Sequence, residues 1–151
     1  MPKYRLLTIE ELKEFEKEFV DFLVVNGIEP EKWIELKEND QDSVDKIIEL
    51  FSDVILESVL RKVEFIQLKS KKYVHAIQCL SDKMVSIALE DSAKDSEKSG
   101  DESKREDSLS IYKSEKKYIE SREKEIFDLI QKGYLISDGD LFKKLQLASL
   151  G

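Results

Sequence analysis

The 151-residue sequence is poor in the residues on which most small catalytic and metal sites depend. One cysteine, Cys79, and one histidine, His75, exclude an intramolecular disulfide, a multi-cysteine zinc site and a histidine pair. The five glycines stand singly, and no glycine-rich phosphate loop, G-x-S-x-G or H-E-x-x-H motif occurs. The sequence also lacks an apolar signal segment and any run of about 18 apolar residues, so we expect a cytoplasmic protein that does not engage a membrane.

Charge is what the sequence has in excess. Charged residues make up 38% of the chain, and 25 Lys and Arg stand against 33 Asp and Glu, a net charge of −8. Most of the acidity lies in residues 1–62, which hold 9 basic and 16 acidic residues. Such a surface repels a phosphate backbone, so nucleic acid is not expected as a partner. A helix-turn-helix over 126–147 is a minor alternative, because its second helix offers few basic side chains.

Apolar residues recur at helical spacing through the N-terminal part of the sequence. Thr8 and Glu11 have the spacing of a capping box, and Gly27 is a typical helix stop. Counted from these signals, the pattern predicts helices over 9–26, 30–38 and 43–62.

The pattern then changes to short runs rich in Val, Ile, Phe and Tyr, separated by polar turns. These runs predict an antiparallel three-stranded meander with strands at 63–68, 73–80 and 84–89. Residues 91–108 contain a single apolar side chain, Ala93, which predicts a disordered acidic linker. Beyond it, 111–132 predicts a charged helix, and Ser137 is expected to cap a last short helix.

These elements together predict an α+β fold with three parts: an α+β core over 1–90, the linker over 91–108 and a C-terminal helical arm over 109–151. We expect the N-terminal helices to pack on one face of the meander. The arm has too many apolar side chains to leave in water, so we expect it to dock on the other face. It can do so in its own chain or exchanged with a second copy, which would make a homodimer.

Several segments resemble a family of bacterial proteins of about this length that is classed as a domain of unknown function. The resemblance is strongest over residues 4–90 and patchy afterwards, and it rests on packing and capping residues. It implies a shared fold, no established activity and no functional residue. The segments that carry it are Tyr4–Leu12, Phe19–Ile28 followed by Trp33, Phe51–Phe65, and Ile136–Phe142.

His75 and Cys79 are the first pair to consider as a nucleophile and its base. Four residues apart on a strand, they face the same side but sit roughly 13 Å apart along it, at about 3.3 Å per residue. A catalytic dyad needs about 3 Å between its reacting atoms. We therefore interpret Cys79 as a small buried apolar residue, and His75 alone is left as a candidate base.

Two sets of charged residues are candidates for partner binding. Glu49, Asp53 and Glu57 form one carboxylate stripe on the helix over 43–62, which could also hold a hard cation if Glu14 and Glu18 converged on it. Lys69, Lys71 and Lys72, with Lys83 on the next turn, would give the meander a basic end; such lysines also protect sheet edges from aggregation.

No cofactor, metal site or catalytic residue follows from these patterns. The sequence favours a non-enzymatic protein-interaction or regulatory module with a protein partner. The alternative is a small metal-dependent enzyme, hydrolase-like, that uses the acidic face of the helix over 43–62.

Overall fold

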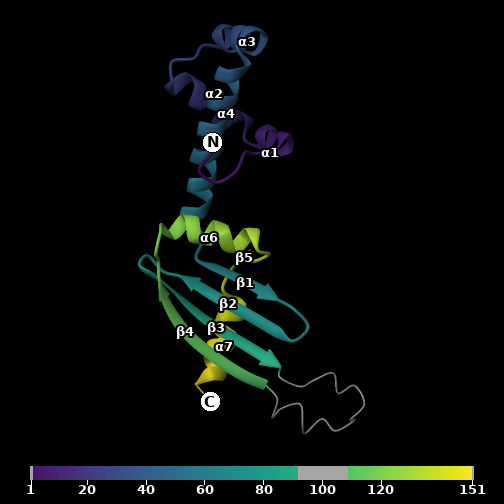
Figure 1. Cartoon of the computed structure of the whole chain (residues 1–151), viewed down its shortest axis with the longest axis vertical. Coiled ribbons are helices and arrows are strands. Elements are labelled where there is room, and N and C mark those ends of the chain that lie inside the picture. Colours follow the sequence, from purple (N-terminus) through teal and green to yellow (C-terminus); the bar gives the residue numbers. More distant parts are fainter. Residues whose placement is uncertain (1, 92–108, 151) are drawn as a thin grey trace. The chain divides into compact units, whose positions relative to one another are not determined.

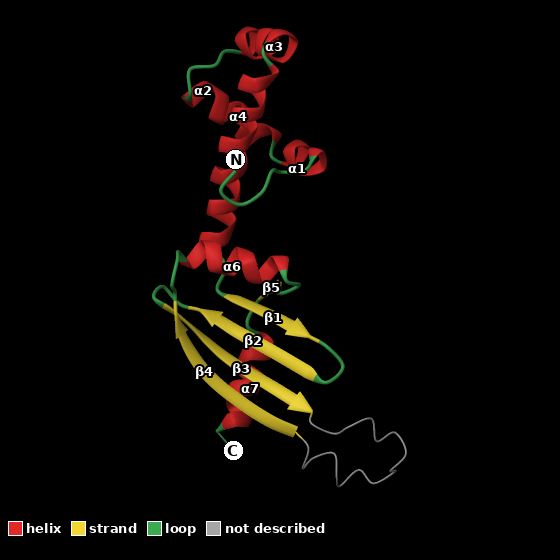
Figure 2. Cartoon of the chain, in the orientation of Figure 1, coloured by secondary structure: helices red, strands yellow, loops and turns green. Residues whose placement is uncertain are grey.

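The computed structural model describes residues 2–91 and 109–150, and the chain divides into two compact units. Residues 1–59 form the N-terminal unit, and residues 60–151 form the C-terminal unit. The first is made of helices and the second of a sheet with helices (Figures 1 and 2). The α+β class predicted from the sequence is confirmed.

The N-terminal unit is built on α4, whose last residues, Leu60 and Arg61, belong to the C-terminal unit. The ring of Phe51 on α4 lies against those of Phe19 and Phe22, with centroids 4.9 and 5.4 Å away. Such apolar contacts at helical spacing are what the sequence pattern predicts. The helices of this unit are α1 (Ile9–Glu14), α2 (Glu16–Val25), α3 (Pro30–Asn39) and α4 (Gln41–Arg61).

The predicted helix over 9–26 is two helices, α1 and α2. Between them the backbone at Phe15 has φ −100° and ψ 24°, outside helical values. The amide of Phe15 still bonds to the carbonyl of Glu11, and its carbonyl accepts from Phe19, so hydrogen bonding continues across the break. Neither glycine nor proline marks this position, and the apolar spacing is uninterrupted, so the sequence carried no signal for it.

The capping box predicted at the start of α1 is present. The Glu11 amide donates to the Thr8 hydroxyl at 3.2 Å, and the Glu11 carboxylate accepts from the Thr8 amide at 2.9 Å. The guanidinium of Arg5 adds two parallel bonds to the same carboxylate, at 2.8 and 2.9 Å. These bonds, the Arg5 pair foremost, lower the pKa of Glu11 to about 2.

The C-terminal unit contains a five-stranded sheet rather than a three-stranded meander. Every neighbouring pair in it is antiparallel, and the strand order is β4-β3-β2-β1-β5. Three strands occupy the positions predicted from the sequence, with small shifts at their ends. The strands are β1 (Phe65–Lys69), β2 (Tyr73–Cys79), β3 (Lys83–Asp91), β4 (Leu109–Lys117) and β5 (Leu135–Ser137).

The prediction of one helix over 111–132 is wrong in its first half. Residues 109–117 form β4, which pairs with β3 along its full length, from Asp91↔Leu109 to Lys83↔Lys117. The helix that follows, α6, spans only Arg122–Gln131. β4 is an edge strand whose side chains are mostly exposed, and four of its last five residues are charged, so it lacks the sustained apolar alternation by which a strand is recognised. Pairing with β3 decides its structure.

The two ends of the 92–108 segment are neighbours in the sheet. Asp91 closes β3 and pairs with Leu109, which opens β4. The segment therefore joins paired strands of one sheet, whereas a separate helical arm over 109–151 was expected beyond it. The predicted disorder of 91–108 falls, apart from Asp91, outside the described residues.

A strand near the C-terminus completes the other edge of the sheet. β5 pairs with β1, with Phe65 opposite Ser137. Gly139 then turns the chain into α7 (Asp140–Ser149) at φ +89°, a conformation that favours glycine. A Cβ there would lie 2.5 Å from Cε2 of Phe65, so the absence of a side chain lets this turn close against the ring.

Both faces of the sheet receive a helix from the C-terminal unit itself. α7 contacts β1, β2 and β3 and packs Phe142 and Leu145 onto one face, while α6 borders the other (Figure 1). In the chain described here α7 lies on its own sheet, and exchange of the arm with a second copy stays a prediction. The packing of the N-terminal helices on the meander stays a prediction. The buried cluster under α7 is Phe65, Ala76, Val85, Ile87, Phe142 and Leu145.

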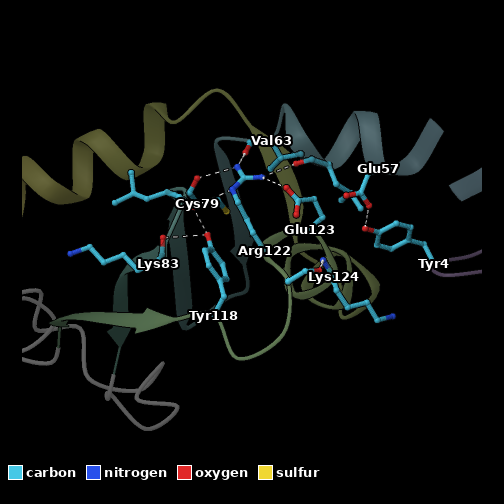
Figure 3. Close-up of polar contacts among 12 residues, drawn as sticks. Tyr4, Glu57, Val63, Cys79, Lys83, Tyr118, Arg122, Glu123 and Lys124 are labelled. Atoms are coloured by element: carbon cyan, nitrogen blue, oxygen red, sulfur yellow. Dashed lines mark hydrogen bonds and ion pairs between the residues drawn. The ribbon is translucent and has the colours of Figure 1, made fainter. Parts of the chain in front are cut away.

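Arg122, the first residue of α6, binds backbone groups from three segments of the C-terminal unit (Figure 3). Its guanidinium donates to the carbonyls of Leu60, Cys79 and Leu80, each at 3.1 Å, and to that of Val63. The side chain is 15% exposed. Five fixed N–H donors suit arginine to such a site, and a lysine ammonium cannot reproduce the fork.

Tyr118 reinforces the same corner. Its hydroxyl donates to the carbonyl of Leu80 at 2.7 Å, with that of Lys83 at 3.2 Å. Burial raises the pKa of Tyr118 to about 12, so the proton that makes this bond stays in place at neutral pH. The β2–β3 turn is therefore held by two side chains, those of Tyr118 ahead of α6 and of Arg122 at its start.

We predict that Glu11→Gln destabilises the N-terminal unit by about 1 kcal/mol at pH 6. Because the pKa of Glu11 is lowered in the folded chain, its contribution is present above its ordinary pKa of about 4.3 and is lost as the pH falls towards 2. Thermal unfolding of the native chain and of the Glu11→Gln variant, followed by circular dichroism, should show the difference between their melting temperatures shrinking over that range. Glu10→Gln, an exposed neighbour on α1, is the control and should show little effect. A difference that does not change with pH would contradict this account.

We predict that Arg122→Lys destabilises the C-terminal unit by about 2–4 kcal/mol. A lysine keeps the positive charge, but its single nitrogen cannot donate to all the carbonyls that the guanidinium binds. Urea unfolding measures the loss. The matched control is Arg61→Lys, at an exposed position, for which we expect a change within about 0.5 kcal/mol. Equal stability of the two variants would show that the Arg122 contacts contribute nothing specific.

Candidate functional site

The acidic stripe predicted on α4 lies in the N-terminal unit and holds the first residues of the chain. Asp53 Oδ1 accepts from the backbone amides of Lys3, at 2.7 Å, and Tyr4, at 3.4 Å. Glu57 Oε2 accepts from the Tyr4 hydroxyl (Figure 3), and it lies 3.4 Å from Lys3 Nζ. Glu49 is half-buried one turn before Asp53. Asp53 and Glu57 therefore fix a segment of their own unit on α4.

These contacts give no support to the predicted metal-dependent hydrolase. Within residues 2–91 and 109–150, His, Cys, Asp and Glu side chains do not gather in threes as a metal ion would need. Glu14 and Glu18, proposed as the second half of such a site, are exposed on α1 and α2. What the stripe contributes is fixed negative charge along one side of α4.

An exposed pair of aliphatic side chains runs beside this stripe. Leu50 is 59% exposed and Val54 is 53% exposed, one helical turn apart on α4. Asp53 and Glu57 follow them at a spacing of three residues, which places each carboxylate next to an aliphatic side chain on the helix surface. We call Leu50 and Val54 the aliphatic row. A second exposed pair, Val20 and Val24, has the same spacing on α2.

The aliphatic row was not expected from the sequence, in which Leu50 and Val54 were given no role. A signal was available, because Leu50 and Val54 recur at the i, i+4 spacing but lie off the face that Phe51 and Ile55 define.

The predicted basic end of the meander is only partly correct. Lys69 ends β1, Lys71 and Lys72 lie in the turn before β2, and all three are exposed. Lys83, however, begins β3 beyond the next turn, at the opposite end of the sheet, because successive antiparallel turns alternate ends. It forms an ion pair with Glu115 at 3.1 Å. The candidate patch therefore consists of Lys69, Lys71 and Lys72, and partner binding there stays a prediction.

His75 and Cys79 are both on β2, and neighbours engage or bury each of them separately. The Nδ1 atom of His75 is hydrogen-bonded to the Tyr134 hydroxyl, and burial lowers the pKa of His75, so the ring is neutral at pH 7. Cys79 is buried, which raises the pKa of its thiol to about 11 despite the opposing effect of Arg122. A protonated, enclosed thiol is a poor nucleophile, in agreement with the interpretation of Cys79 as a core residue.

The helix-turn-helix alternative does not match the arrangement of the last helices. β5 lies between α6 and α7 in the chain, and the two helices lie on opposite faces of the sheet. A helix-turn-helix motif instead joins its two helices by a short turn, so that the second can enter the major groove.

Comparison with known proteins identifies the family. The chain belongs to a family of unknown function, DUF6495, whose model matches residues 1–149. The resemblance to a family of unknown function is thereby confirmed, and the match extends over the C-terminal residues where the matching segments were sparse. The bacterial origin expected from the resemblance stays a prediction. No curated protein matches the chain. No solved structure matches it either. In the part of the chain that the structure describes, no helix has both the length and the apolar content needed to cross a membrane.

We predict that Cys79 reacts slowly with a thiol reagent in the folded protein. A pKa of about 11 leaves roughly 100-fold less thiolate near pH 8 than an ordinary cysteine has, and burial adds a barrier to access. The reaction with dithionitrobenzoate should therefore be at least about 100-fold slower in buffer than in unfolding concentrations of urea. Rapid labelling in buffer would show that this thiol is open to attack and would revive it as a candidate nucleophile.

Proposed function

We propose that this protein is a non-enzymatic protein-interaction module whose N-terminal unit binds a basic amphipathic helix of a partner protein. The observation that carries the proposal is the aliphatic row on α4, exposed beside fixed carboxylates. Adjacent aliphatic side chains on a protein surface mark interaction sites, because covering them removes apolar area from water.

The charge of the N-terminal unit selects the occupant. Residues 1–59 hold 7 basic and 16 acidic residues, whereas residues 60–151 hold 18 basic and 17 acidic residues. A second copy would bring the same excess of negative charge to this unit, and like charges brought together oppose association. A basic partner gains attraction at long range and ion pairs at the rim.

The spacing of the row favours a helix as the partner segment. Leu50 and Val54 lie one turn apart, and a partner helix with apolar residues at i, i+3, i+4 and i+7 presents a stripe of the same kind. Lysines or arginines beside that stripe would face Asp53 and Glu57. Because Lys3 and Tyr4 hold these two carboxylates in place, little side-chain entropy remains to be lost when a partner binds.

The test uses designed peptides and full-length protein. A Leu/Lys peptide with its leucines on one helical face should bind the chain at physiological salt, measured by fluorescence anisotropy. The double variant Leu50→Ser/Val54→Ser should weaken that binding by at least about 10-fold, because each aliphatic side chain contributes about 1.5–3 kcal/mol when fully buried. Higher salt should weaken the binding further.

Two controls separate the row from general attraction between opposite charges. A peptide of the same composition, shuffled so that its leucines are spread around the helix, should bind at least about 10-fold more weakly. The variant Leu147→Ser/Leu150→Ser, at residues that are exposed in the C-terminal unit, should bind the patterned peptide as the native chain does. Equal binding of the two peptides, or no effect of the Leu50/Val54 variant, would overturn the proposal.

A further inference from the structure

A cavity of ≈ 430 Å³ lies in the C-terminal unit, on the face of the sheet opposite α7. Strands β2, β3 and β4 form its floor, and α6 with the connector before it forms its wall. Its volume falls within the range of small-molecule sites, about 300–1,000 Å³. The cavity shares no lining residue with the aliphatic row, so what it does is independent of the proposed function.

The apolar part of the lining is well defined. Ile77 and Met84 are buried on neighbouring strands of the floor, and Leu129 of α6 lines the cavity from the wall. Ile119, which lines it from the connector, is 85% exposed. A methionine beside rigid aliphatic residues gives such a floor some capacity to adapt to the shape of a ligand. These surfaces suit a flat apolar body.

Two serines place hydroxyl groups in the same cavity. Ser86 of β3 and Ser114 of β4 are paired across the strands, and their Oγ atoms are 2.7 Å apart. Only one of the two hydrogens is used between them, so the pair keeps one O–H donor and several lone pairs for a third group. His75 also lines the cavity, with Nδ1 bound to Tyr134.

The charged groups of the lining are balanced within the protein. Lys116 forms an ion pair with Glu125 at 2.8 Å, and the other carboxylate oxygen of Glu125 accepts from the Ile119 amide at 2.9 Å. Asp128 is paired with Lys124 at 3.5 Å. The remaining two charged residues of the lining, Glu120 and Lys132, have opposite signs. A ligand with a net charge would meet no matching excess of the opposite sign.

We propose that this cavity is a binding site for a neutral small molecule with a flat apolar body and one hydroxyl or amide group, which hydrogen-bonds to the Ser86–Ser114 pair. The apolar floor supplies most of the affinity, and the serine pair fixes the orientation of the ligand. Charged molecules of the same shape bind more weakly, because they would lose hydration without gaining a partner charge.

The experiment uses 1-naphthol as the probe and full-length, isotope-labelled protein. Titration with 1-naphthol should shift the amide signals of the residues on the cavity floor, with a dissociation constant of about 1 mM or below, as expected for a ligand of this size. Naphthalene-1-carboxylate has the same ring system but carries a negative charge, and it should bind at least about 10-fold more weakly.

The variant Ser114→Leu fills the cavity and removes a hydroxyl, and it should weaken 1-naphthol binding at least about 10-fold. Ser110→Leu is the matched control, on the same strand and the same face but outside the lining, and it should bind as the native chain does. Ser114→Val replaces Ser114→Leu if the larger side chain disturbs the fold, which the same spectra report. Failure of 1-naphthol to shift the floor signals, equal binding of the carboxylate, or unchanged binding in the Ser114 variants would each overturn the proposal.

Discussion

The guanidinium of Arg122 binds backbone carbonyls at the end of α4, just before β1 and at the β2–β3 turn. The last carbonyls of a helix have no intrahelical partner, and those of a turn often lack one. A single planar cation with five donors satisfies several of them together. The position of α6 follows from this, because Arg122 is its first residue. The cavity beside α6 follows in turn, since that helix is its wall.

The N-terminal unit depends on a different kind of interaction. Its excess of carboxylates is accommodated on the surface of the helices, where water screens the repulsion. Three of the carboxylates, those of Glu11, Asp53 and Glu57, bind residues that precede the first helix. Arg5 closes the capping box of α1, while Lys3 and Tyr4 bind the stripe on α4. A short segment ahead of the first helix thus organises two helices at once, and the buried hydroxyl of Ser52 accepts the Leu7 amide between them.

Local patterns in the sequence were enough to predict much of this fold, and the errors have definable causes. The helix over 43–62 and the strands at 73–80 and 84–89 were predicted closely, because their apolar spacing is strong and is bounded by polar turns. β4 and β5 were not predicted as strands, because an exposed edge strand and a three-residue strand depend on their partners, β3 and β1. The acidic stripe was visible as an i, i+4 pattern. The contacts of Arg122 were not, since they join residues distant in sequence through backbone carbonyls that every residue has.

The pairing of β5 with β1 has a consequence for the order in which the chain acquires its structure during synthesis. The contacts among α1–α4 all lie within residues 1–59, so they can form while the rest of the chain is still being made. β1 emerges soon afterwards, but its outer edge stays open until residues 135–137 and the helix after them have left the ribosome. For most of the synthesis of the C-terminal unit, a strand carrying Phe65 and Ile66 therefore has an unpaired edge, the kind of surface on which nascent chains misassemble and which chaperones cover.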